Sequence, residues 1–104
     1  MTATYRVLIA DKIAADGLAP LREDSRFELI TKPGLSLPDL TQALTEVDAV
    51  IVRSAAKVPR EAMSATTRLK VIGRAGVGVD TIDVDAATEK GIAVLNAPAG
   101  NTIS

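Results

Sequence analysis

The sequence contains no cysteine, histidine or tryptophan, and only one tyrosine and one phenylalanine among its 104 residues. Without cysteine, the chain has neither a disulfide scaffold nor a thiolate metal site. Without histidine, it lacks the side chain that most often acts as a general acid or base near neutral pH. Two aromatic residues provide no platform for stacking nucleic-acid bases. Reactions that depend on these groups are therefore disfavoured for this chain alone.

The sequence also lacks an excess charge of one sign and a long apolar run. The formal net charge is −1, so no electrostatic attraction to nucleic acid or to an anionic membrane is expected. No apolar run is long enough to span a bilayer, and no signal-peptide pattern opens the chain. We expect one soluble, cytoplasmic domain with a core of its own.

Strand-like and helix-like patterns alternate along the chain. Apolar runs predict five strands, at 5–10, 26–31, 48–52, 69–73 and 92–96. The second run alternates and suits an edge strand, whereas continuous apolar runs are typical of strands buried on both faces of a parallel sheet. Helices are predicted at 13–21, from 36, at 59–66 and at 83–91. This order predicts an α/β fold with a flavodoxin-like, doubly wound parallel sheet in the strand order 2-1-3-4-5.

Two of the predicted helices carry clear boundary signals. Ser36 is a candidate N-cap, and Pro38 suits the first turn that follows it. Asp83 can cap the last helix, which Gly91 is expected to end. The apolar stripe of the helix after Ser36 is predicted to contain Leu37, Leu40, Leu44 and Val47.

Two arginines close apolar runs that are expected to be neighbouring strands. Arg53 follows the run 48–52, and Arg74 follows the run 69–73. Ligands of open parallel sheets bind outside the carboxyl ends of the strands. Because arginine binds carboxylate and phosphate through paired hydrogen bonds, the pattern predicts a site for a small anion. Either arginine taken alone also fits a solvated surface residue or a structural ion pair.

The glycine-rich run after Arg74 has three interpretations. It resembles the dinucleotide-binding G-x-G-x-x-G pattern but lacks the third glycine, and it follows the fourth strand instead of the first. It also suits a tight turn that needs glycine. We favour an intermediate hypothesis, in which the backbone N–H groups of this loop face an anion.

Polar residues near the same edge are open to two interpretations. Ser54 either hydrogen-bonds the anion or satisfies the backbone of its own turn. Asn96 and Asn101 suit turns for the same local reason. A phospho-acceptor receiver domain is disfavoured, because Arg53 stands where its acceptor aspartate would be and Asp11 alone ends the first strand.

Taken together, the runs 51–58, 71–80 and 91–104 resemble the D-isomer-specific 2-hydroxyacid dehydrogenases. The resemblance covers essentially the whole chain, in order and with matching spacing. Within that family, the run Gly-Arg-Ala-Gly-Val-Gly-Val-Asp at 73–80, with Arg-Ser upstream, points to the phosphoglycerate enzymes.

The resemblance implies a substrate-binding domain and a role for each residue that matches. Arg53 would bind the phosphate or carboxylate of 3-phosphoglycerate or phosphohydroxypyruvate, with Ser54 beside it, and Arg74 would line the same pocket. The backbone at Gly76 and Val77 would hold the substrate carboxylate. Asn101 would contact the substrate near a hinge.

The chain departs from this family at Ser104, where the family continues into an NAD-binding domain that carries its catalytic residues. Residues 1–104 are therefore predicted to be the N-terminal part of the substrate-binding domain, lacking its last helix. The parent would be an NAD-dependent oxidoreductase of L-serine biosynthesis. The chain alone is expected to be inactive, with no cofactor or metal of its own.

Two alternatives for the function stay open. One is a free-standing α/β module that binds a small anionic metabolite or a protein partner. The other, within the family, is a dehydrogenase of another D-2-hydroxy acid. Whichever function applies, strands three to five are expected to leave one apolar face bare, and this predicts a homodimer through that face or through the C-terminal segment.

Overall fold

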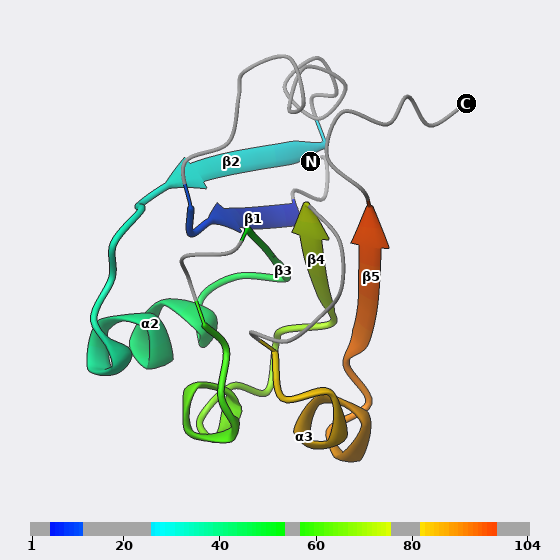
Figure 1. Cartoon of the computed structure of the whole chain (residues 1–104). Helices are drawn as coiled ribbons and strands as arrows, with labels where there is room; N and C mark the ends of the chain where they lie inside the picture. The colour runs from blue at the N-terminus through cyan, green and yellow to red at the C-terminus, as the bar shows by residue number, and fades with distance from the viewer. Residues whose placement is uncertain (1–4, 12–25, 54–56, 76–81, 98–104) are drawn as a thin grey trace.

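The computed structural model describes residues 5–11, 26–53, 57–75 and 82–97 of the chain (Figure 1). These residues form one sheet of five parallel strands in the order β2-β1-β3-β4-β5. The predicted topology is confirmed. The strands are β1 (Tyr5–Ile9), β2 (Phe27–Thr31), β3 (Ala49–Val52), β4 (Val71–Ala75) and β5 (Ala93–Ala97).

Three helical segments connect the described strands. They are α2 (Leu37–Leu44), the 3-10 helix η1 (Arg60–Met63) and α3 (Val84–Glu89). The helix expected at 59–66 is therefore shorter and more tightly wound than predicted. The chain leaves the helical path before Thr66, whose hydroxyl accepts hydrogen bonds from the N–H groups of Arg68 and Leu69. The helix predicted at 13–21 lies outside the described residues.

The predicted helix boundaries are confirmed at both α-helices. The Ser36 side chain accepts a hydrogen bond from the N–H of Asp39, and the Asp83 side chain accepts one from the N–H of Ala86. Gly91 ends α3 with a φ of 73°, a conformation that residues with a Cβ rarely adopt. The capping residues thus fix where each helix meets the sheet.

All three helical segments cover the same face of the sheet, as Figure 1 shows below the strands. This arrangement follows from right-handed crossovers that all run in the same direction along the sheet, from β2 to β3, from β3 to β4 and from β4 to β5. Two residues of the predicted stripe depart from the prediction. Leu37, the first residue of α2, remains 45% exposed, and Val47 is buried but follows the end of α2; Leu40 and Leu44 are buried as expected. The core on this face contains Leu8, Val50, Val52 and Ile72 from the strands and Leu40, Leu44, Ala62, Met63, Ala86 and Ala87 from the helices.

The opposite face of the sheet is covered unevenly. Val7 and Ile9 of β1 are buried there, with the half-buried Ile51 of β3 packed against them. On β5, at the far edge of the sheet, Leu95 is 58% exposed. The apolar cover on this face therefore thins from β1 towards β5.

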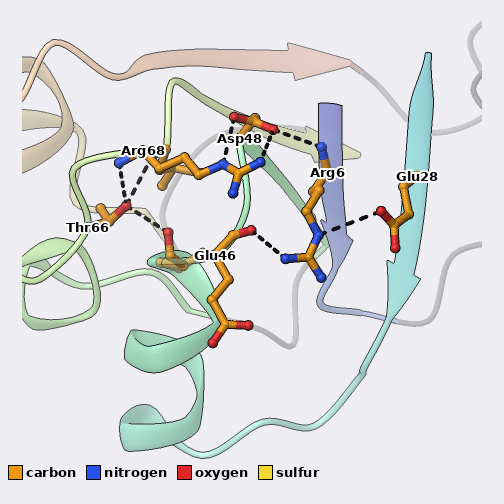
Figure 2. Close-up of polar contacts among 8 residues, drawn as sticks. Arg6, Glu28, Glu46, Asp48, Thr66 and Arg68 are labelled. Carbon is orange, nitrogen blue, oxygen red and sulfur yellow. Dashed lines mark hydrogen bonds and ion pairs between the residues drawn. The ribbon is translucent and has the colours of Figure 1, made fainter. Parts of the chain in front are cut away.

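Charged residues join the amino ends of the strands (Figure 2). The Asp48 carboxylate accepts hydrogen bonds from the backbone N–H of Arg6, at 2.8 Å, and from the Arg68 guanidinium, at 3.0 and 3.3 Å. The Arg6 guanidinium donates to the carbonyl of Glu46 and lies 3.7 Å from the Glu28 carboxylate. These contacts hold the starts of β1, β2 and β3 together at the edge opposite the two strand-end arginines.

No helix among the described residues is both long and apolar enough to cross a membrane.

Candidate functional site

The carboxyl ends of the parallel strands form the edge at which the sequence predicts an anion site. Arg53 directly follows β3, and Arg74 is the fourth residue of β4. The register pairs Val52 with Arg74 across these two adjacent strands. The structure therefore brings both arginines to neighbouring positions at this edge, the usual location of ligands in such sheets.

The two arginines have different surroundings. Arg74 is only 8% exposed, and it shares a face of β4 with the core residue Ile72, the face that the helices cover. Arg53 is exposed and lies beyond the last residue of its strand. Arg53 is thus accessible from solvent, whereas Arg74 is largely enclosed by the fold.

Asp11 was not predicted to belong to this edge, yet it lies there and is 4% exposed. Its Oδ2 atom accepts a hydrogen bond of 2.5 Å from the backbone N–H of Arg53. A signal for this contact was present in the sequence. In the order 2-1-3-4-5, the first and third strands are neighbours, so the residues that follow them lie at the same edge, and the register of β1 with β3 brings Asp11 and Arg53 level.

A pocket of about 400 Å³ opens beside the carboxyl end of β1, between α2 with the residues that precede it and the segment 57–59 that precedes η1. Its lining is apolar apart from Asp11 and Lys57. Lys57 belongs to the run 51–58 and lies on the pocket wall. The lining consists of Ala10, Asp11, Gly34, Leu35, Leu37, Leu40, Lys57 and Pro59.

Four of the predicted site residues lie outside the described part of the chain. They are Ser54, Gly76, Val77 and Asn101. The predicted backbone anion site at Gly76 and Val77, and the hinge contact of Asn101, therefore stay predictions. Asn96 is in β5, where the register pairs it with Arg74.

The described residues contain no group of three or more His, Cys, Asp or Glu side chains that could hold a metal ion. A dinucleotide site is not assigned to this chain either. Its fingerprint belongs to the turn after the first strand of the sheet, whereas the paired glycines here, Gly76 and Gly78, follow β4. Among the described residues, this edge carries the exposed Arg53, the buried Arg74 and the buried Asp11.

A comparison with protein families identifies the chain. Residues 7–104 match the family profile described as "D-isomer specific 2-hydroxyacid dehydrogenase, catalytic domain". The chain belongs to the D-isomer-specific 2-hydroxyacid dehydrogenase family. The members of this family are oxidoreductases, and the resemblance drawn from the sequence is confirmed.

Several curated relatives of the chain within this family are D-3-phosphoglycerate dehydrogenases. The D-3-phosphoglycerate dehydrogenase of Bacillus subtilis is 49% identical over 100 residues, and that of Archaeoglobus fulgidus is 46% identical over 99 residues. The matches cover 96% and 95% of this chain, but only 18% and 19% of the relatives. The chain therefore spans less than a fifth of the length of the enzymes that it resembles.

Solved structures of the family share the fold. NAD⁺-bound 3-phosphoglycerate dehydrogenase from Entamoeba histolytica aligns with a TM-score of 0.78 and 28% identity, over 90% of this chain and 33% of that one. NAD-dependent formate dehydrogenase from Staphylococcus aureus, in complex with NAD, aligns with a TM-score of 0.70 and 28% identity, over 88% of this chain and 30% of that one. Dehydrogenases with different substrates thus share this sheet.

Proposed function

We propose that residues 1–104 are the N-terminal part of the substrate-binding domain of an NAD-dependent D-3-phosphoglycerate dehydrogenase. The parent enzyme would oxidise 3-phosphoglycerate to phosphohydroxypyruvate, the first step of L-serine biosynthesis. The observation that carries this proposal is the position of Arg53 and Arg74 on adjacent strand ends at the carboxyl edge. The phosphoglycerate dehydrogenases among the relatives support the choice of substrate. A cytoplasmic location is part of the same proposal.

In this proposal the edge recognises the two anionic groups of the substrate. The exposed Arg53 binds one anionic group, and the buried Arg74, on the adjacent strand, contributes the second guanidinium. Ser54, the backbone of Gly76 and Val77, and Asn101 complete the contacts. Each paired contact between arginine and an anion contributes on the order of 1–3 kcal/mol at a partly exposed site.

We further propose that the chain binds substrate weakly and does not turn it over. The sequence contains no histidine, and no catalytic acid or base is assigned among the described residues. Because this chain contributes only part of the pocket, the expected dissociation constant is millimolar at best. This corresponds to a binding free energy of roughly −4 kcal/mol. Purified chain should therefore not oxidise NADH in the presence of phosphohydroxypyruvate, and measurable turnover would contradict this part of the proposal.

Titration of the ¹⁵N-labelled chain with 3-phosphoglycerate tests the site. The amide signals of Arg53, Arg74, Gly76 and Val77 should shift progressively up to about tens of millimolar ligand. Combined replacement Arg53→Ala and Arg74→Ala should abolish these shifts. Lys70→Ala is the matched control, because it removes a positive charge at the amino end of β4.

The titration contradicts the proposal if the shifts are absent, or if the double variant keeps them. D-lactate, which has the carboxylate but no phosphate, separates the alternatives within the family. Equal shifts with D-lactate and 3-phosphoglycerate would favour a dehydrogenase of another D-2-hydroxy acid. No binding of either acid would favour an α/β module with another partner.

We also propose a homodimer that forms through the sheet face opposite the helices. The exposed Leu95 and Ala93 of β5 and the half-buried Val71 and Ile51 support it. Burying several hundred Å² of apolar surface offers on the order of 10 kcal/mol before the costs of association.

Sedimentation equilibrium at micromolar concentration tests the homodimer. Leu95→Lys should give a monomer, whereas Val84→Lys, on the helical side, should leave the dimer intact. A monomeric wild-type chain that binds no hydrophobic dye would contradict the homodimer.

A further inference from the structure

The contact between Asp11 and Arg53 replaces one step of the β1–β3 ladder. The N–H of Ala10 donates to the carbonyl of Ile51 at 2.9 Å, so the ladder continues one residue past the end of β1. The next donor on this side of β3 is the N–H of Arg53, and the Asp11 side chain accepts it at 2.5 Å. The Asp11 side chain, at the end of β1, therefore fixes the backbone of Arg53 at the end of the neighbouring strand β3.

We propose that Asp11 is a positioning residue, which holds the backbone of Arg53 and thereby sets the strength of anion binding at this edge. The inference rests on the proposed function, because it takes the Arg53 guanidinium to be a ligand of the substrate anion. Asp11 is 4% exposed, so water competes little for its carboxylate. Hydrogen bonds from a backbone N–H to a carboxylate are among the stronger ones in proteins.

The position of Arg53 in the chain explains why such an anchor matters. Arg53 is the first residue after β3, so strand pairing alone does not define its backbone. A guanidinium binds phosphate or carboxylate through two parallel hydrogen bonds only when its backbone position and side-chain orientation are defined. Fixing the backbone before the ligand arrives reduces the ordering cost of binding.

Positioning and charge predict opposite effects when Asp11 is replaced. If its carboxylate acted on the ligand by charge, its removal would strengthen anion binding in both Asp11→Ala and Asp11→Asn. If it positions Arg53, Asp11→Ala removes the acceptor and weakens binding, whereas Asp11→Asn keeps a carbonyl oxygen in its place. Rescue by asparagine is therefore the distinguishing result.

The experiment uses the ¹⁵N-labelled 104-residue chain, titrated with 3-phosphoglycerate. Asp11→Ala should weaken binding roughly five- to tenfold, and Asp11→Asn should stay within about twofold of wild type. Asp39→Ala is the matched control, because it removes an exposed carboxylate from the first turn of α2 and should not weaken binding. Hydrogen exchange at the Arg53 amide should accelerate in Asp11→Ala and not in Asp11→Asn.

Each outcome decides the inference. Stronger or unchanged binding by Asp11→Ala, or equal weakening by both variants, would overturn it. If wild type binds no 3-phosphoglycerate, the proposed function fails, and exchange at the Arg53 amide alone decides whether Asp11 holds this backbone. If Asp11→Ala does not fold, Asp11→Asn decides: wild-type protection of the Arg53 amide supports the inference, and its loss overturns it.

Discussion

The hydroxyl of Thr66 donates a hydrogen bond of 2.7 Å to the carbonyl of Leu44, 22 residues earlier in the chain. The same oxygen accepts hydrogen bonds from the N–H groups of Arg68, at 3.2 Å, and Leu69, at 3.1 Å. Thr66 is buried, so its hydroxyl relies on these partners. One side chain thus joins the end of α2 to the segment that leads into β4.

Replacement of Thr66 by valine should therefore destabilise the chain by about 2–3 kcal/mol, because the shape is kept while buried backbone groups lose their partner. Thr67→Val is the matched control, since Thr67 is exposed and the next residue along. Urea unfolding followed by circular dichroism measures both. Equal midpoints for the two variants would show that the buried hydroxyl contributes little.

The stability of the chain should fall in acid partly through Asp48. The hydrogen bond from the Arg68 guanidinium lowers the pKa of Asp48 below its ordinary value of 3.8, and the Arg6 N–H acts in the same direction against partial burial. A lowered folded-state pKa stabilises the fold above the unfolded pKa, and this contribution is lost as the pH falls through the lower folded value.

The free energy of unfolding should consequently decrease less steeply below about pH 4 in Asp48→Asn than in wild type. At neutral pH this variant should be less stable by about 1 kcal/mol or more, because the charged acceptor of Arg68 and Arg6 is gone. Glu61→Gln, on η1, controls for the change in net charge. If the free energy of unfolding fell equally steeply with decreasing pH in wild type and Asp48→Asn, Asp48 would not be a source of the acid sensitivity.

Truncation to alanine should destabilise the chain far more at a buried position of α2 than at an exposed one. Leu44 is fully buried, so Leu44→Ala should cost about 2–5 kcal/mol through lost burial and the cavity left behind. Leu37 of the same helix is 45% exposed, and Leu37→Ala should change the free energy of unfolding by only a few tenths of a kcal/mol, on the order expected for surface positions. Thermal unfolding of both variants tests the difference.

Replacement of glycine by alanine should have different effects on stability at Gly91 and at Gly73. Gly91 has a φ of 73°, so Gly91→Ala should destabilise by about 1–2 kcal/mol even though no atom lies within 4 Å of the added Cβ. At Gly73 of β4 the added Cβ would meet Ile51 Cγ1 at 3.8 Å, an ordinary contact. Gly73→Ala should therefore be neutral or stabilise by up to about 1 kcal/mol. Similar losses in both variants would refute the conformational argument.

Local signals were sufficient to predict that the five strands exist, the start of both α-helices and the end of α3, but they placed the fourth strand two residues early. Continuous apolar runs locate buried parallel strands, and Ser36, Asp83 and Gly91 act on backbone groups only a few residues away. The hydroxyl of Thr66 was not predictable in this way. Its partner Leu44 comes close only after α2 has packed against the sheet. The exposure of Leu37 was missed because helical periodicity does not say where a helix begins to overlie its sheet.

The candidate site was predictable only in part. The strand order brings Arg53 and Arg74 together, and the apolar runs indicate that order. The contact of Asp11 with the Arg53 N–H joins residues 42 positions apart, and it depends on β1 and β3 ending at the same level of the sheet. The length of an apolar run does not define that level to within one residue.

The parallel sheet also constrains the order in which the chain folds. No two neighbouring strands can form as a hairpin, because every strand reaches its partner through a crossover. Pairing β1 with β3 requires closing a loop of 42 positions, the separation of Arg6 from its hydrogen-bond partner Asp48. Loop closure of this kind is entropically costly before any contact compensates for it. Refolding should therefore be slow for a chain of this length, and β1 must wait for β3 before the centre of the sheet exists.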